Sequence, residues 1–161
     1  TMLTDICQRP GIEACGVFIG HIDEQGNWFV EEARPLQNIY NSPVYFEFAP
    51  EELLNVELTA PGELIGVYHS HPTGFAQAST TDRNNMQRVN QEQQIPWVWL
   101  IISGPFDAAF RERVGGSLKN AAIIAYHHYA EGLRTIAIHV EEDTSKPLVE
   151  FEEQREREIG K

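Results

Sequence analysis

The hydrophobic residues of this chain fall into short runs that are separated by polar residues and turn formers. Residues 13–22 and 28–36 are two such runs, and the turn-forming sequence between them predicts a β-hairpin. Residues 50–59 begin with proline and predict a helix, and residues 97–103 predict a further strand. Additional strands are predicted at 110–114, 121–129 and 134–140, with a short helix near 5–10. We therefore expect an α/β (α+β) fold with a mixed central β-sheet and helices packed on its faces.

A strand with two histidines at its end is the most informative part of the sequence. Residues 62–71 are mostly apolar, with a β-branched and aromatic bias, and they run into Pro72, so they predict a strand that stops there. Residues two apart in a strand point to the same face, which would place the rings of His69 and His71 side by side. From Ser79 onward the sequence predicts a helix that begins with a Ser-x-x-Asp capping pattern. The intervening loop would return the start of this helix to the end of the strand.

These residues have the chemistry of a zinc site. His69 and His71 offer imidazole nitrogens, and Asp82, in the first turn of the predicted helix, offers a carboxylate oxygen. Zinc accepts both kinds of atom, and three protein ligands with one open position are typical of a catalytic site. Each part alone has an ordinary interpretation, because a His-x-His pair can be a polar surface pair and Ser79 with Asp82 can be a simple helix cap. Their combination favours a zinc hydrolase.

The same residues match the motif of a known family. Glu13 is followed by His-Ser-His-Pro at 69–72 and then by Ser79 and Asp82, with seven residues between His71 and Ser79. This pattern resembles that of the JAMM/MPN+ zinc metalloproteases, and in particular their short prokaryotic or phage-type members. The resemblance covers most of the chain, and none of the ligand positions departs from the family pattern.

The resemblance implies a fold and a role for each motif residue. The fold would be the deaminase-like three-layer arrangement. His69, His71 and Asp82 would be the ligands of one zinc ion per chain. Glu13 would be the general acid/base that takes a proton from zinc-bound water and passes it to the leaving amine, and Ser79 would stabilise the oxyanion. A site of this kind hydrolyses a peptide or isopeptide bond.

Two rival chemistries are less well supported. Cys15 could act as a nucleophile, but it lies in an apolar run without a basic neighbour or helix N-terminus, so we expect a small buried hydrophobe. A zinc cytidine deaminase would share the architecture, yet its His-x-Glu and Pro-Cys-x-x-Cys signatures do not occur. His127 and His128 are adjacent in a predicted strand and point to opposite faces, so at best one of them faces the cleft.

Composition narrows the function classes further. The 161 residues carry a formal net charge of −12, which leaves no basic stripe for nucleic acid and favours a basic protein partner or substrate tail. No apolar run approaches the roughly 18 residues of a membrane span, and we expect no signal peptide. With two cysteines and an intracellular type of composition, the chain is expected in the reducing cytoplasm.

The domain organisation predicted from the sequence is simple. Residues 1–140 are expected to form the metalloprotease domain, and residues 141–161 an acidic C-terminal tail or helix. Residues 33–50 and 104–120 are expected to frame the cleft. The sequence leaves the oligomeric state open.

The substrate follows only from the resemblance. Family members cleave bonds at the C-terminus of ubiquitin or ubiquitin-like proteins, so the expected partner is a ubiquitin-like or sulfur-carrier protein whose flexible tail could lie as an added strand beside the site. Two alternatives stay open at this point. The chain could be a non-catalytic scaffold of the same fold for protein assembly, or a peptidase for phage tail or cell-wall peptides.

Overall fold

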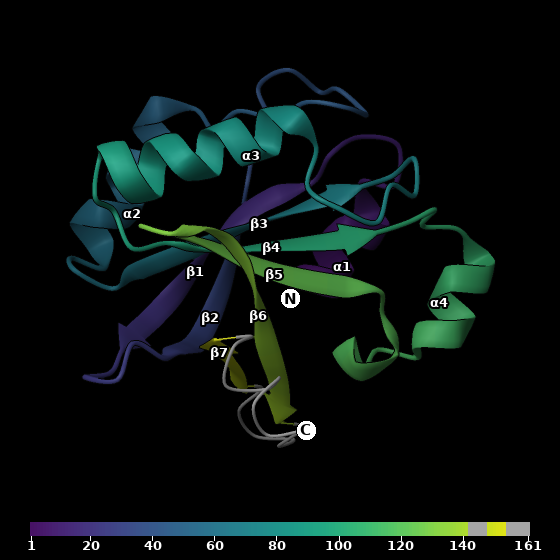
Figure 1. Ribbon diagram of the computed structural model, residues 1–161. Helices are drawn as coiled ribbons and strands as arrows, with labels where there is room; N and C mark the ends of the chain where they lie inside the picture. Colours follow the sequence, from purple (N-terminus) through teal and green to yellow (C-terminus); the bar gives the residue numbers. More distant parts are fainter. Residues whose placement is uncertain (142–147, 154–161) are drawn as a thin grey trace.

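The computed structural model describes residues 1–141 in full and residues 148–153 as backbone. Within these described residues, seven strands and six helical segments follow one another along the chain, and Figure 1 shows their arrangement. In order they are α1 (Met2–Gln8), β1 (Cys15–Ile22), β2 (Trp28–Leu36), α2 (Pro50–Thr59), β3 (Leu64–His71), α3 (Thr80–Gln87), η1 (Arg88–Glu92), β4 (Val98–Ser103), α4 (Ala108–Val114), η2 (Leu118–Asn120), β5 (Ile123–Tyr129), β6 (Gly132–Glu141) and β7 (Leu148–Glu153). No helix among the described residues is long and apolar enough to cross a membrane.

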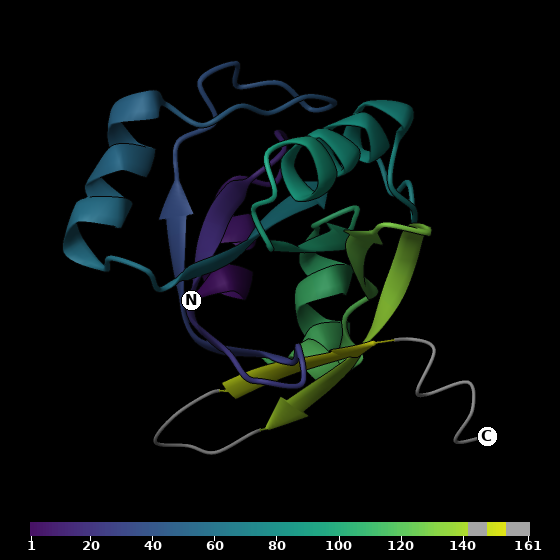
Figure 2. The same cartoon turned by 60° about the vertical axis from the view of Figure 1, so that its left-hand side comes forward.

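The strands form one mixed sheet that curls until its two sides meet. The strand order is β1-β2-β7-β6-β5-β4-β3, and β3 returns to pair with β1. Neighbouring strands are antiparallel except for β3 and β4, which are parallel. Figure 2 shows β7 crossing between β2 and β6 at the base of the molecule. The predicted mixed α/β class is confirmed, and closure through β7 is a feature that the sequence did not indicate.

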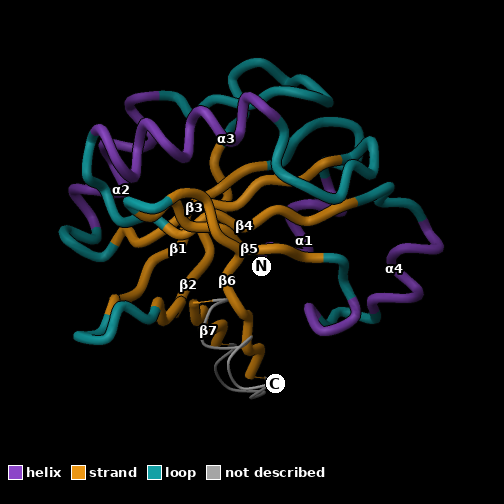
Figure 3. Tube along the Cα trace, in the orientation of Figure 1, coloured by secondary structure: helices purple, strands orange, loops and turns teal. Residues whose placement is uncertain are grey.

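Helices cover both faces of the sheet, as expected. One core contains residues of α1 and α4, including Ile6 and Phe110, packed with Phe18, Tyr68 and other strand residues. The second core contains residues of α2 and α3, including Val56 and Met86, packed with strand residues of the opposite face. Figure 3 shows α2 and α3 on one side of the strands and α4 well apart from them. Because each strand near the centre is buried on both faces, β1, β3 and β4 read as nearly continuous apolar runs.

Most of the predicted elements are confirmed, and one is wrong in type. Residues 110–114, predicted as a strand, belong to α4. The Asp107 side chain caps this helix by accepting a hydrogen bond from the Phe110 N–H at 2.9 Å, and Gly115 ends it in the left-handed conformation. Phe110 and Val114, four residues apart, then face the core together. The short apolar pattern of residues 110–114 is compatible with a strand or a helix, and the caps at Asp107 and Gly115 favour the helix.

The C-terminal segment also differs from its prediction. Of the residues 141–161 predicted as an acidic tail or helix, residues 148–153 are a strand that pairs with β2 and β6. Residues 142–147 and 154–161 lie outside the described residues. The domain boundary at residue 140 stays a prediction, while β7 takes part in the same sheet as the strands before it.

A partly buried ion pair fixes α1 beneath the strands that carry the motif. Asp5 accepts hydrogen bonds from Arg9 Nε at 2.8 Å and Nη2 at 2.7 Å, and from the Tyr68 hydroxyl at 2.7 Å. Arg9 Nη2 also donates to the Cys15 carbonyl at 3.0 Å. Tyr68 directly precedes His69, so this network holds the end of β3 and the start of β1 together.

Candidate metal centre

The end of β3 carries both motif histidines on the same face of the sheet. His69 is 1% exposed and His71 is also buried. Ser70, between them, points the other way: its Oγ accepts a hydrogen bond from the Ala14 N–H at 2.8 Å, and its own N–H donates to the Ala14 carbonyl at 2.9 Å. Side chains alternate along β3 as expected for a strand. The two histidines face the candidate site, and Ser70 on the other face binds β3 to the segment that follows Glu13.

The start of α3 brings a carboxylate to these histidines. Ser79 and Asp82 form a capping box, in which Ser79 Oγ accepts from the Asp82 N–H at 3.1 Å and Asp82 Oδ2 accepts from the Ser79 N–H at 2.9 Å. The cap also restricts the Asp82 side chain, which is buried. Just before the helix, the Ala78 N–H donates to the Tyr126 hydroxyl at 3.1 Å and fixes the loop on β5. The predicted helix cap is thus present, and its geometry aims Asp82 at β3.

The two imidazoles and the Asp82 carboxylate meet at short distances. His69 Nε2 lies 3.2 Å from Asp82 Oδ1, and His71 Nε2 lies 3.1 Å from Asp82 Oδ2. The two Nε2 atoms are 3.1 Å apart. His71 Nδ1 lies 2.8 Å from the Phe75 carbonyl, which can only accept, so the Nδ1 proton is used there. In a neutral His71 ring, Nε2 then presents a lone pair to the carboxylate.

Lone pairs that converge in this way need a cation among them. In the metal-free protein a proton on His71 can serve: burial opposes the charged ring, but hydrogen bonding to Asp82 and Phe75 outweighs it and raises the pKa of His71. Burial likewise opposes ionisation of Asp82, yet the two histidines hold its pKa below the usual range. A zinc ion accepts these same nitrogen and oxygen donors, so the residues present fit this metal.

His69 is oriented in a different way from His71. Its ring stacks on Phe46 with centroids 4.6 Å apart and an interplanar angle of 27°. Its Nδ1 is the buried side-chain polar atom that has no hydrogen-bond partner among the described residues. Metal-binding histidines usually donate their other nitrogen to a carbonyl or carboxylate, as His71 does. For His69, ring packing takes the place of that hydrogen bond.

Glu13 lies beside the histidines, just before β1. One carboxylate oxygen of Glu13 and one ring nitrogen from each of His69 and His71 all lie within 4.8 Å of one another, so Glu13 is a second candidate ligand besides Asp82. Asp82 makes contacts of 3.2 Å with His69 and 3.1 Å with His71, so both carboxylates are within reach of the histidine nitrogens. Burial raises the pKa of Glu13 to about 8, with the negative charge of Asp82 adding to the rise and His71 opposing it.

A small pocket connects these carboxylates to the outside. It has a volume of about 10 Å³, which is room for about one water molecule. Its walls are Glu13, Val44, Tyr45, Phe46, Ser79, Thr81, Asp82 and Asn85. Residues 44–46 thus line the pocket, as expected for the stretch 33–50, whereas no wall residue comes from 104–120. Figure 2 shows the loop that contains residues 44–46 passing over the strands between α2 and α3.

A much larger cavity elsewhere lacks this chemistry. It has a volume of about 570 Å³ and lies along β5, β6 and η2, where it is lined mainly by Ile, Leu, Ala and Val side chains. It contains none of the motif residues, and its titratable groups are Lys119 and His139. The convergence of charged and metal-binding groups, rather than cavity size, therefore marks the motif residues as the candidate functional site.

The structure brings the five motif residues together, although their individual roles stay predictions. It does not bring in the other candidates. His127 Nδ1 bonds to the Trp97 carbonyl at 2.8 Å and His128 Nδ1 to the Tyr129 carbonyl at 2.9 Å, both on β5 and its neighbours. Cys15 is buried, and burial raises the pKa of its thiol to about 12, so it does not supply a thiolate.

Two residues of this site were not foreseen from the sequence. Phe46 packs on His69, and Asn38 bonds to the backbone of Glu13. Both lie in the irregular loop between β2 and α2, where no periodicity indicates which side chains turn inward. An Asn and a Phe in a loop have no local signal that separates them from ordinary turn and surface residues.

Fold and site together define an α/β protein with a His-x-His and carboxylate centre at the end of a central strand. The family described as prokaryotic homologs of the JAB domain matches residues 1–114, and the chain belongs to this family. The resemblance to the JAMM/MPN+ proteins is thereby confirmed. A desampylase of Pyrococcus furiosus is 33% identical over 101 residues, covering 61% of this chain and 64% of the relative. A desampylase of Haloferax volcanii is 37% identical over 78 residues, covering 46% of this chain and 54% of the relative.

A solved structure supports the fold independently. The solution structure of a protein from Desulfitobacterium hafniense superimposes with a TM-score of 0.63, covering 88% of this chain and 87% of that one. The sequence identity is 24%, so this likeness concerns the fold alone. The match extends well beyond residue 114 and supports the arrangement of the later strands.

Proposed function

We propose that this protein is a zinc-dependent metallopeptidase that hydrolyses a peptide or isopeptide bond at the C-terminal tail of a ubiquitin-like or sulfur-carrier protein. The observation that carries the proposal is the convergence of His69, His71 and Asp82 within 3.2 Å, next to the buried carboxyl of Glu13. The family membership and the two desampylase relatives support the same reaction class. A cytoplasmic location is part of this proposal.

The chain's own residues divide the work. His69, His71 and Asp82 would hold one zinc ion, which when bound lowers the pKa of a water molecule and polarises the substrate carbonyl. Glu13 would take a proton and later give it to the leaving amine. A carboxyl whose pKa is about 8 in the metal-free protein exchanges protons near neutral pH, which suits both steps. The small pocket has room for about one water molecule beside these groups.

The surface around the pocket suits an unfolded tail more than a small molecule. Val44 is 71% exposed, Phe75 and Tyr40 are each 54% exposed, and Tyr45 is 43% exposed. Apolar side chains left in solvent at the rim of a site are typical of places where a partner chain packs. The net charge of −12 adds attraction for a tail or partner with basic residues.

The direct test is hydrolysis of a defined conjugate. A ubiquitin-like or sulfur-carrier protein would be joined through its C-terminus to a lysine amine of a reporter protein and incubated with the zinc-loaded chain. We expect release of the reporter, loss of release after treatment with a chelator, and recovery when zinc is returned. If the zinc-loaded protein cleaves no such conjugate, the non-catalytic scaffold is favoured, and cleavage only of phage tail or cell-wall peptides would change the substrate class.

Ser79 gives a second test within the site. Its Oγ accepts from the Asp82 N–H, and no described residue accepts from its hydroxyl, so the hydroxyl can donate to an oxyanion. Ser79→Ala should lower kcat by about 10² to 10³-fold with KM nearly unchanged. It should also lower the free energy of unfolding by about 1 kcal/mol, because the helix loses its cap.

The control for Ser79 is the cap of another helix. Asp107 caps α4 by accepting from the Phe110 N–H, and it is not a wall residue of the small pocket. Asp107→Ala should cost similar stability in a thermal or urea unfolding measurement and leave kcat unchanged. A Ser79→Ala protein that loses affinity in KM alone would make Ser79 a binding or capping residue.

A further inference from the structure

Asn38 is a buried amide whose hydrogen-bonding capacity is fully used by the candidate site and its loop. The residue is 0% exposed. Its Nδ2 donates to the Glu13 carbonyl at 3.0 Å and to the Tyr45 carbonyl at 2.8 Å. Its Oδ1 accepts from the Tyr40 N–H at 3.0 Å and from the Glu47 N–H at 3.4 Å. Two donors and two acceptor positions are all that a primary amide offers.

Among the described residues, the backbone N–H and carbonyl of Glu13 form their hydrogen bonds with this loop. Its N–H donates to the Ser42 carbonyl at 2.8 Å, and its carbonyl accepts from Asn38. The next residue, Ala14, is bonded to Ser70 of β3. Glu13 therefore lies at a junction, with β3 on one side and the loop on the other. Its side-chain direction depends on both.

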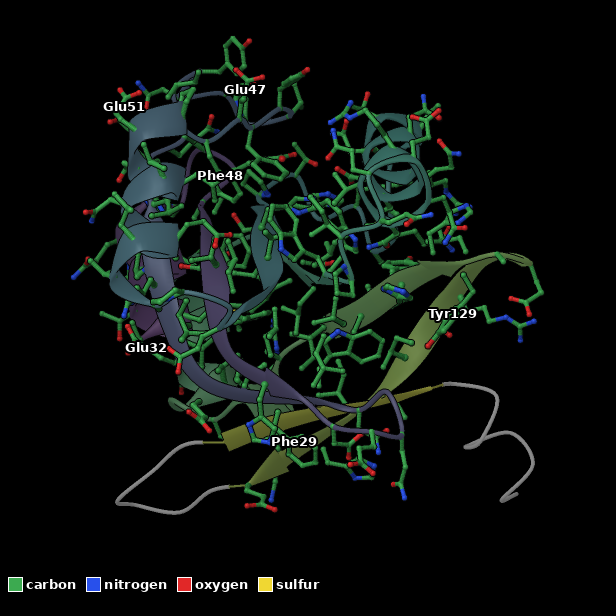
Figure 4. All side chains as sticks on the ribbon, turned by 90° about the vertical axis from the view of Figure 1, so that its left-hand side faces the viewer. Phe29, Glu32, Glu47, Phe48, Glu51 and Tyr129 are labelled. Carbon is green, nitrogen blue, oxygen red and sulfur yellow. The ribbon has the colours of Figure 1, made fainter. Side chains whose placement is uncertain are left out.

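The loop of residues 38–48 has two different surfaces. Its inner side carries Asn38 and Phe46, which contact Glu13 and His69. Its outer side carries exposed apolar residues, among them Tyr40 and Tyr45, whose rings meet edge to face at 5.1 Å. Figure 4 shows Glu47 at the outer edge of this loop and Phe48 below it, nearer the core. Any partner that packs on the outer side acts on a segment that is bonded directly to Glu13.

We propose that Asn38 is the positioning residue for Glu13 and couples substrate contact on the 38–48 loop to proton transfer at Glu13. This inference rests on the proposed function for the catalytic role of Glu13. The physical reason is the steep dependence of proton transfer on geometry, since a misplacement of about 1 Å can cost about 10²-fold in rate. Asn38 neither contacts the histidines nor belongs to the set that would hold zinc, so its loss should leave metal binding intact.

The chain offers a closely matched control in Asn90. This residue is also buried, and its amide also makes four hydrogen bonds. Its Nδ2 donates to the carbonyls of Ile95 and Trp97, and its Oδ1 accepts from Trp99 Nε1 and from the His128 N–H. These partners belong to the region of η1, β4 and β5, away from Glu13. Asn38→Ala and Asn90→Ala therefore remove the same number of buried hydrogen bonds in two places.

The two variants should separate positioning from general stability. Both should lower the free energy of unfolding, because each leaves several buried backbone groups unsatisfied. Asn38→Ala alone should lower kcat, by about 10²-fold, at unchanged zinc content. Equal losses of kcat in the two variants, or loss of zinc in Asn38→Ala, would overturn the inference.

A double variant tests whether Asn38 acts through Glu13. If it does, Asn38→Ala should have little further effect on the residual turnover of Glu13→Gln, because the group that it positions is already absent. Multiplicative losses in the double variant would mean that Asn38 acts by another route and would overturn the inference.

Hydrogen exchange gives a readout that does not need turnover. The Glu13 amide, bonded to the Ser42 carbonyl, should exchange faster in metal-free Asn38→Ala than in the unsubstituted protein, and at an unchanged rate in Asn90→Ala. If no conjugate is cleaved by the unsubstituted protein, the proposed function fails, and this exchange rate still decides whether Asn38 positions Glu13. An unchanged Glu13 rate in Asn38→Ala would refute it.

Discussion

Replacement of His71 by alanine should remove zinc and turnover together. In the unsubstituted protein we expect about one zinc per chain by elemental analysis, and in His71→Ala almost none. The reason lies in the geometry: His71 Nε2 is 3.1 Å from both His69 Nε2 and Asp82 Oδ2, so its loss leaves two donors where three converge. Two donors bind zinc far more weakly than three. Turnover should be lost with the metal, because bound zinc would activate the water and polarise the substrate carbonyl.

The same variant should change the response of stability to metal. A ligand that binds only the folded state stabilises it by about 4 kcal/mol when present at a thousandfold excess over its Kd. Added zinc should therefore raise the Tm of the unsubstituted protein and leave that of His71→Ala nearly unchanged. His128→Ala is the matched control, because this β5 histidine bonds to the Tyr129 carbonyl and takes no part in the cluster. If His71→Ala still contains about one zinc per chain, the proposed metal centre is wrong.

Replacement of Glu13 by glutamine should leave the zinc content unchanged, unlike His71→Ala, but should also cause a large loss of kcat. The amide keeps the size of the side chain but cannot take up a proton at neutral pH, so kcat should fall by about 10² to 10⁴-fold. Zinc content should stay at the level of the unsubstituted protein, since Asp82 still offers a carboxylate within 3.2 Å of the histidines. Elemental analysis and steady-state kinetics on the same preparation measure both quantities.

This variant also decides between the two possible ligand sets. A set of Glu13, His69 and His71 satisfies the spacing of a metal site as well, and it would predict loss of zinc from Glu13→Gln. Retention of zinc with loss of turnover assigns Glu13 to proton transfer and Asp82 to the metal. Glu51→Gln, at an exposed position on α2, controls for the change in charge and should leave both quantities unchanged.

The sequence allowed the candidate site to be predicted because its residues lie in regular elements. His69 and His71 follow from alternation in a strand, and Asp82 follows from a helix cap whose pattern is local. The loop that completes the site has no such regularity. Asn38 reaches Glu13 across 25 positions of sequence, and Phe46 reaches His69 from another element, so both contacts depend on the tertiary fold.

The errors in the fold prediction have a similar origin. Residues 110–114 are too short for their period to separate a strand from a helix, and the cap at Asp107 was the available signal. The strand at 148–153 follows a highly charged stretch, and charge suggested a solvated tail. This strand pairs with β2, which lies more than a hundred positions earlier in the chain, and with β6, which lies about ten positions earlier. Local sequence patterns do not indicate such pairings.

The way in which β7 closes the sheet has a consequence for how this protein could change its choice of substrate. Every described strand has a neighbour on each side, and the part of β2 that β7 does not reach, residues 31–36, carries two glutamates, an arginine and a proline that discourage another chain from adding there. At this edge of β2 a bound tail would then be held by loops, in contrast to the added strand expected from the family resemblance. Selectivity can in this way diverge by exchange of the 38–48 loop while the strands that carry the histidines stay as they are. Such an exchange would have to keep Asn38. A transplanted loop without this amide would bind a new partner but would no longer position Glu13 for proton transfer.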